Sequence, residues 1–235
     1  ADLGTKGNTG YDGFGIIIEG NYNEIINSYG ENVASEAFSI WDGSSHNRIA
    51  YCDYRNDDDQ LQTDYQFTTR QITFDKITEY NIIENNRAYR YHNGAHKGHG
   101  LSNKGGSNNL WQDNYLYKLP IKAVFATSFD NIFRHNKAEG FDSCHIQIRS
   151  GANHNIFNSN YIEVDYTAIV MISADDGSTS NIEIEKINSG HDNTIINNIL
   201  IGGRKGITIG NEKSSNATNT NNKISNNIFH KQSGE

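Results

Sequence analysis

Proline, which interrupts helices and strands, and cysteine, which can cross-link a fold, are scarce in this sequence. It contains one proline, two cysteines and one methionine among 235 residues. It also lacks a run of about 20 apolar residues, which a membrane-spanning helix would require, and its first residues show no basic-then-apolar signal peptide. We therefore expect a soluble chain without a membrane span, from which any export signal has already been removed.

Asparagine, by contrast, is abundant. The chain has 33 asparagines and only 35% hydrophobic residues, a composition that would fit a disordered chain. A regular alternation of apolar residues, Ile-x-Ile or a close variant, argues against disorder because it returns at intervals along the sequence. The pattern indicates repeated β-strands.

The alternating pairs recur at intervals of 22 to 37 residues. They are Ile16/Ile18, Phe38/Ile40, Ile72/Phe74, Leu101/Asn103, Val124/Ala126, Ile146/Ile148, Val170/Ile172 and Ile207/Ile209. Intervals near the lower value fit one turn of a parallel β-helix, and longer intervals fit a turn with an inserted loop. The sequence therefore predicts an all-β solenoid of about eight coils with three parallel sheets.

Each coil also carries an Asn-Ile or Asn-x-Ile step, which we place at a corner between strands. The steps begin at Asn23, Asn47, Asn131, Asn155, Asn193 and Asn222. Asparagine tolerates the left-handed backbone of a tight corner, and stacked asparagine side chains can hydrogen-bond from coil to coil. We expect the corner asparagines to form such a ladder.

No change of composition and no linker divides the chain, so we expect a single domain over residues 1–235. No capping helix precedes the first coil, so the chain could be a segment of a longer protein. Loops 57–70, 86–98 and 174–190 are expected to project and to form groove walls. Cys52 and Cys144 fall in distant coils and are expected to be unpaired, buried thiols.

Charge is unevenly distributed along the sequence. The net charge of −8 argues against nucleic-acid binding. The segment from Arg87 to Arg149, however, contains nine basic residues and only four acidic ones. Five histidines fall in the same segment: His92, His96, His99, His135 and His145. A basic, histidine-rich middle in an acidic chain indicates a site for an anionic ligand.

Alternation along each strand predicts which residues face outward. If Ile146 and Ile148 point inward, Gln147 and Arg149 point outward, and the same register gives two outward columns. The first column is Glu19, Trp41, Asp75, Lys104, Thr127, Arg149, Ser173 and Gly210. The second is Ile17, Ser39, Thr73, Ser102, Phe125, Gln147, Met171 and Thr208. A face with an aromatic end and a cationic centre fits an extended, anionic, hydroxyl-rich chain.

Two neighbouring coils carry a more specific signal. It reads Thr127-Ser-Phe-Asp-Asn-Ile-Phe-Arg-His-Asn136 and then Ile146-Gln-Ile-Arg-Ser-Gly151. These segments resemble the polysaccharide lyases of the chondroitinase B and alginate lyase family, which are right-handed parallel β-helices that cleave uronic-acid polymers by β-elimination. The resemblance implies that Arg149 is the catalytic arginine. The family's catalytic lysine would fall on Thr127, and a similar lysine segment, Ser102-Asn-Lys104, lies one coil earlier.

β-Elimination requires neutralisation of a carboxylate, a base for the adjacent proton and an acid for the leaving oxygen. Arg149 and Lys122 are our candidates for the first task, because cations neutralise a carboxylate and arginine binds it in two parallel hydrogen bonds. The candidate bases are Lys104 and His145. Tyr115 or Tyr117 could serve as the acid. The candidate substrate-binding residues are Trp41, Asp75, His99, Thr127 and Gln147.

The sequence leaves two functions open. The first is a secreted lyase, extracellular or at the cell surface, that cleaves an anionic polysaccharide such as alginate. The second, favoured by Thr127, is a non-catalytic β-helix that serves as a surface, adhesion or structural module and binds glycans. Epimerisation would use the same proton abstraction, and a hydrolase would need facing carboxylates. No cofactor is certain, although the acidic run Asp57–Asp59 could bind Ca²⁺.

Overall fold

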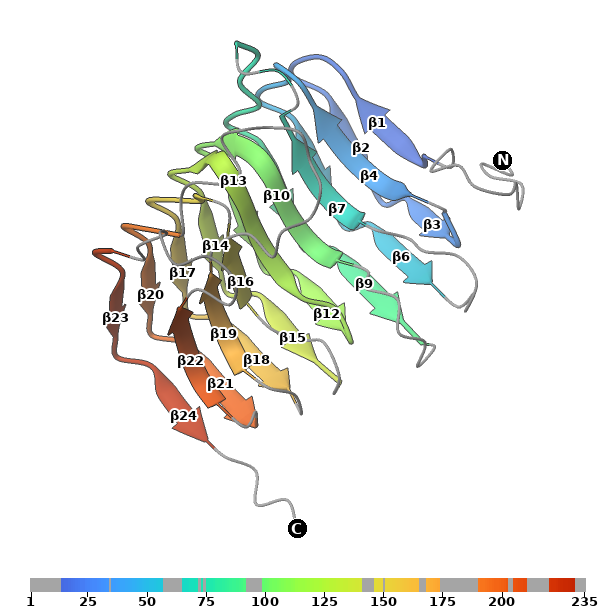
Figure 1. Cartoon of the computed structure of the whole chain (residues 1–235). Coiled ribbons are helices and arrows are strands. Elements are labelled where there is room, and N and C mark those ends of the chain that lie inside the picture. Colours follow the sequence, from blue (N-terminus) through green and yellow to red (C-terminus); the bar gives the residue numbers. More distant parts are fainter. Residues whose placement is uncertain are drawn as a thin grey trace, which may run out of the picture.

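The computed structural model is a right-handed parallel β-helix of three sheets, which confirms the predicted solenoid (Figure 1). It describes residues 14–33, 35–56, 65–71, 73, 75–91, 99–140, 146–149, 151–164, 168–173, 190–202, 205–210 and 220–230. Each coil contributes one strand to each sheet. Strands that are three apart in the sequence are therefore neighbours in the same sheet and pair in parallel. In Figure 1 the coils stack from the blue N-terminal strands to the red C-terminal strands.

Each sheet contains eight strands. Sheet A consists of β1 (Ile16–Ile18), β4 (Glu36–Trp41), β7 (Tyr65–Arg70), β10 (His99–Ser107), β13 (Ile121–Phe129), β16 (Ile146–Arg149), β19 (Ala168–Ser173) and β22 (Lys205–Gly210). Sheet B consists of β2 (Glu24–Ile26), β5 (Arg48–Ala50), β8 (Ile82–Glu84), β11 (Leu110–Gln112), β14 (Ile132–Arg134), β17 (Ile156–Asn158), β20 (Thr194–Ile196) and β23 (Lys223–Ser225). Sheet C consists of β3 (Tyr29–Glu31), β6 (Asp53–Asn56), β9 (Arg87–Arg90), β12 (Tyr115–Tyr117), β15 (Lys137–Glu139), β18 (Tyr161–Val164), β21 (Ile199–Gly202) and β24 (Ile228–His230).

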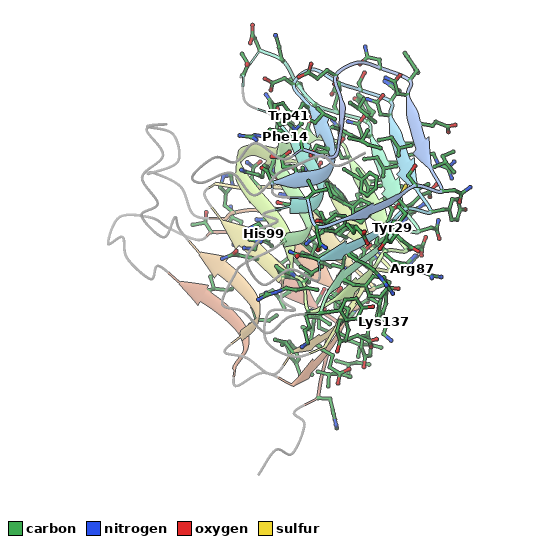
Figure 2. All side chains as sticks on the ribbon, turned by 90° about the vertical axis from the view of Figure 1, so that its right-hand side faces the viewer. Phe14, Tyr29, Trp41, Arg87, His99 and Lys137 are labelled. Carbon is green, nitrogen blue, oxygen red and sulfur yellow. The ribbon has the colours of Figure 1, made fainter. Side chains whose placement is uncertain are left out.

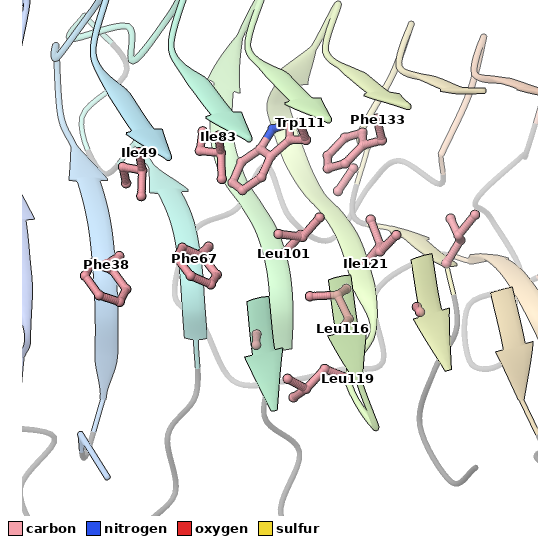
Figure 3. Close-up of a cluster of buried hydrophobic side chains, with 14 of the residues drawn as sticks. Phe38, Ile49, Phe67, Ile83, Leu101, Trp111, Leu116, Leu119, Ile121 and Phe133 are labelled. Atoms are coloured by element: carbon pink, nitrogen blue, oxygen red, sulfur yellow. The ribbon is translucent and has the colours of Figure 1, made fainter. Parts of the chain in front are cut away.

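The core is a set of side-chain stacks that run along the solenoid (Figure 3). On sheet A, Phe38 and Phe67 stack with ring centroids 5.2 Å apart. On sheet B, Trp111, Phe133 and Phe157 form a second stack with centroid distances of 5.5 and 4.7 Å. Parallel in-register strands place equivalent side chains one strand spacing apart, so like residues pack on like.

The predicted asparagine ladder is present at the corner between sheets A and B. It runs through Asn23, Asn47, Asn81, Asn109, Asn131, Asn155, Asn193 and Asn222. In each step the side-chain amide and the backbone N–H of one asparagine donate to the Oδ1 of the next, as Asn81 does to Asn109 at 3.0 Å. The ladder satisfies polar groups that the corner removes from water.

A second ladder, which the sequence analysis missed, lies between sheets B and C. It joins Asn86, Asn114, Asn136, Asn160, Asn198 and Asn227 in the same way. In each corner of the two ladders, the residue with left-handed backbone is the one immediately before the ladder position. This residue is an asparagine in some corners and another type in others, such as Tyr80 (φ 55°) or His154 (φ 53°). The asparagines of the ladders therefore serve mainly as hydrogen-bonding groups, which corrects our expectation that they adopt the left-handed backbone.

Cys52 occupies a ladder position, and its thiol is buried and free. Burial raises the pKa of this thiol. Its Sγ lies 3.6 Å from the Ile25 carbonyl oxygen. One coil later, Asn86 occupies the equivalent position, and its Nδ2 donates to the equivalent carbonyl, that of Ile49. Cys144 lies outside the described residues.

Replacing Cys52 with asparagine should extend the second ladder by one step. The new amide could donate to the Ile25 carbonyl and to Asn86 Oδ1, each net hydrogen bond contributing about 1 kcal/mol. We expect the free energy of unfolding to rise by about 1–2 kcal/mol in urea titration, while Cys52→Ser, which adds no amide, should not raise it. A less stable Cys52→Asn protein would contradict this account.

Two of the three predicted loops are shorter than expected. Residues 65–70 form β7 and residues 87–90 form β9, so the expected ranges 57–70 and 86–98 included strand residues. Residues 57–64, 92–98 and 174–189 of the predicted loops lie outside the described residues. In the described part of the chain, no helix has the length and apolar character needed to cross a membrane.

Candidate functional site

The outward positions of sheet A form two columns that run across its strands. The Lys104 column contains Trp41, Arg70, Lys104, Val124, Arg149 and Ser173. The Lys122 column contains Ser39, Thr68, Ser102, Lys122, Gln147 and Met171. Lys104 and Arg149 are two strands apart, as predicted, which corresponds to a backbone separation of about 10 Å.

The third coil has a different register from the one we predicted. Phe67 and Thr69, rather than Ile72 and Phe74, align with Phe38 and Ile40. Arg70 therefore pairs with Trp41 and Lys104, while Asp75 lies in an exposed turn after the strand. The sequence offers two alternating segments close together here, and pairing with the neighbouring strands selects the first. An arginine replaces the predicted acid, which makes the column more basic.

The fifth coil is also shifted, by three residues. Ile121 and Ala123, rather than Val124 and Ala126, align with Ile146 and Ile148. Because side chains alternate along a strand, an odd shift exchanges the two faces. Lys122 consequently joins Gln147 and Ser102 on the outward face. Val124, not Thr127, lies opposite Arg149.

Lys122 and His99 are in contact at the edge of this face. Lys122 Nζ lies 3.3 Å from His99 Nε2, and the lysine side chain is buried whereas the histidine is half-buried. An ammonium group donates and cannot accept, so the contact requires an unprotonated Nε2 on the imidazole. The contact therefore pairs the lysine ammonium with an acceptor nitrogen of the ring.

A buried carboxylate organises the other end of the Lys104 column. Glu36 is 1% exposed and accepts hydrogen bonds from Ser39 Oγ (2.6 Å), Trp41 Nε1 (2.8 Å) and Arg70 Nη1 (2.8 Å). The Arg70 guanidinium also stacks on the Trp41 ring at 4.9 Å, and Phe14 packs edge-on against it. Trp41 therefore fixes Arg70 in place. The predicted role of Trp41 in substrate binding stays a prediction.

From Ser39 to Lys122, the Lys122 column is polar but shielded from water. Thr68 donates to the Ser102 carbonyl at 2.7 Å, and Ser102 Oγ and Gln147 Oε1 are buried without a hydrogen-bond partner among the described atoms. Unsatisfied buried polar atoms cost free energy, so they are uncommon unless a ligand or water completes them. Gln147, a predicted binding residue, thus lies beside Lys122 as a half-buried polar group.

The basic window of the sequence is divided among several faces. Only Lys104, Lys122 and Arg149 of its described residues belong to the outward columns of sheet A, and Arg70 joins them from outside the window. Arg134 lies on sheet B, where it donates to Gln112, and Arg87 and Lys137 lie on sheet C. His135 is at the corner between sheets B and C.

Tyr115 and Tyr117 also lie on sheet C, so neither is placed near the cations of sheet A. Figure 2 shows Arg87 and Lys137 along one flank of the solenoid and His99 well away from them. Tyr115 donates to Glu139 Oε1 at 2.7 Å, and burial together with this hydrogen bond raises the pKa of Tyr115 far above its usual range. The predicted role of either tyrosine as an acid for the leaving group on sheet A is wrong.

Several predicted residues fall outside what the structure describes. They are His145, the side chains of Arg149 and Thr127, and the acidic run at 57–59. Among the described residues, no group of three or more His, Cys, Asp or Glu side chains is arranged to hold a metal ion. The Ca²⁺ hypothesis therefore concerns residues beyond this description.

Comparisons with protein-family models, curated proteins and solved structures gave no match for this chain.

Proposed function

We propose that this chain is a secreted polysaccharide lyase that binds an anionic, uronic-acid polymer along the outward face of sheet A. The observation that carries the proposal is the Lys104 column, in which Arg70 and Lys104 occupy neighbouring strands and Arg149 lies two strands further on. These positions span about 14 Å of sheet. Regularly spaced cations suit a polymer with regularly spaced carboxylates.

Lys122 adds a cation on the next column, diagonally adjacent to Arg149. In elimination, Arg149 and Lys122 would neutralise the uronate carboxylate and thereby acidify the proton on the neighbouring C5. A base removes that proton, the C4–O bond breaks, a C4–C5 double bond forms, and the leaving oxygen receives a proton. His99 would position Lys122 through their 3.3 Å contact.

Lys104 is our preferred base. Its strand partner is Arg70, and a like charge nearby favours the neutral amine that proton abstraction requires. Glu36 offsets part of the Arg70 charge through its hydrogen bond at 2.8 Å. His145 is the alternative base, as the sequence indicates, because a histidine near its ordinary pKa can act at neutral pH.

The test is the ultraviolet absorbance of the unsaturated product, measured with a panel of polyuronates that includes alginate and polygalacturonate. The wild-type chain should produce a rise on at least one polymer, and Arg149→Ala should abolish it. A folded wild-type protein that yields no product from any polymer would refute the lyase. Proton exchange at C5 without cleavage would instead indicate an epimerase.

A binding module without catalysis is the second candidate. The lyase resemblance puts the family's lysine on Thr127, and strand pairing puts Val124 opposite Arg149, so neither position supplies a lysine. This function predicts retention on a polyuronate in affinity electrophoresis, weakened by Arg149→Ala, with no absorbing product. The two measurements together separate cleavage from binding.

A further inference from the structure

The outward face of sheet C carries a cluster of tyrosines that the proposed function does not use. Its members are Tyr29, Tyr89, Tyr91, Tyr115, Tyr117 and Tyr161, contributed by or adjoining strands β3, β9, β12 and β18. Tyr29 and Tyr91 are 57% and 46% exposed, and the other four are half-buried. Figure 2 shows Tyr29, Arg87 and Lys137 along this flank, on the other side of the solenoid from His99.

The rings are held in fixed positions by one another. Tyr89 stacks with Tyr91 at a centroid distance of 5.7 Å and an interplanar angle of 8°. Tyr89 also contacts Tyr115 at 5.7 Å, and Tyr91 contacts Tyr117 at 6.0 Å. Four tyrosines from two neighbouring coils therefore form one continuous aromatic surface.

Cations and carboxylates between the tyrosines fix them further. Lys137 Nζ lies 5.7 Å from the Tyr115 ring centroid and 5.4 Å from that of Tyr161. Arg55 packs over Tyr91 at 5.4 Å. The hydroxyls of Tyr115 and Tyr161 donate to Glu139 and Glu163. Little side-chain entropy remains to be lost when a ligand binds such a preorganised surface.

The charges on this face balance, unlike those on sheet A. Four basic residues, Arg55, Arg87, Lys118 and Lys137, accompany four acidic residues, Glu31, Asp53, Glu139 and Glu163. Several of them already interact on the face itself, as Lys137 does with Glu139 at 2.7 Å. A balanced face neither attracts a polyanion nor repels an uncharged chain.

We propose that sheet C is a second carbohydrate-binding surface, and that its ligand is a neutral, β-linked polysaccharide. Extended β-linked glycans are flat ribbons with apolar ring faces and hydroxyl edges, which match tyrosine rings interleaved with charged hydrogen-bonding groups. Strands repeat every ~4.8 Å along the solenoid, so the surface presents a regular array to a regular polymer. The surface would attach the protein to a neutral matrix while sheet A remains accessible.

The experiment compares wild type with the double variant Tyr91→Ala/Tyr117→Ala. Binding is measured by pull-down with insoluble cellulose and chitin and by affinity electrophoresis in hydroxyethyl cellulose. Wild type should be retained, and the double variant should lose at least about tenfold in apparent affinity. Tyr80→Asn is the matched control, because Tyr80 is exposed at another corner and asparagine accepts its left-handed backbone.

Sheet A variants separate this proposal from the proposed function. Arg149→Ala should leave binding to the neutral polymers unchanged while it reduces any action on polyuronates. Thermal unfolding of the double variant establishes that it is folded, and the single variant Tyr91→Phe, which keeps the ring, should retain binding. Absence of wild-type binding to all three polymers would overturn the proposal. So would equal binding by the double variant, or self-association abolished by the double variant, which would identify the face as a protein interface.

Discussion

Replacing Lys104 with alanine is expected to lower kcat on the cleaved polyuronate by about 10²- to 10⁴-fold, the usual contribution of a general base. Lys104 is on β10, directly beside Arg70 on β7, and two strands from Arg149. In the proposed mechanism, this position puts the amine beside a like charge, which favours its neutral form. The rate of product formation at saturating polymer measures the effect.

Lys104→Arg keeps the charge but cannot deprotonate at ordinary pH, so it should restore polymer binding without restoring turnover. Lys223→Ala is the matched control, because Lys223 is an exposed lysine on sheet B. If Lys104→Ala retains most of its activity while His145→Ala loses it, the base is His145 and Lys104 only binds the polymer.

Asn114→Ala is expected to reduce the free energy of unfolding by about 3–5 kcal/mol. Asn114 Oδ1 accepts from the backbone and the side chain of Asn86, and Asn114 Nδ2 donates to the Ile83 carbonyl and to Asn136. The alanine variant leaves several of these buried groups without a partner, and each unsatisfied group costs about 1–3 kcal/mol. Urea titration with the wild-type protein as reference measures the change.

Asn158→Ala provides the comparison for a surface asparagine. Asn158 is half-buried on sheet B, where its Oδ1 accepts from Ser159 and Asn197. Its loss should cost no more than about 1 kcal/mol, because water can replace those hydrogen bonds. Similar destabilisation by the two substitutions would show that the ladder is not a special source of stability.

The architecture could be predicted because its signals are repeated and local. The Ile-x-Ile pairs indicate strands, and their return at coil-length intervals indicates stacking, since a lone coil could not bury its apolar face. The ladder at Asn47, Asn131 and Asn155 was predictable for the same reason. The second ladder through Asn114 and Asn136 is nearly as regular: a second asparagine follows six of the eight first-ladder asparagines by five residues, and this spacing would have revealed it.

The composition of the candidate site depended on pairing between strands. Arg70 was missed and Asp75 was included because the third coil contains two alternating segments, and only the neighbouring strands select between them. Lys122 is absent from both predicted outward columns, although its charge makes it a candidate for catalysis, because the predicted register is three residues off. A shift of one or three residues costs little in local sequence preference, yet it exchanges the faces of the strand.

The sequence by itself therefore determined the β-helix, its three sheets and its first asparagine ladder, because these follow from residue patterns within each coil. The tertiary structure alone decided how the basic window is divided, with Lys104 and Lys122 on sheet A and Arg87 and Lys137 on sheet C. In a solenoid, residues close in sequence can lie on different flanks, whereas residues one coil apart become neighbours. Only the register between coils determines which charges share a surface.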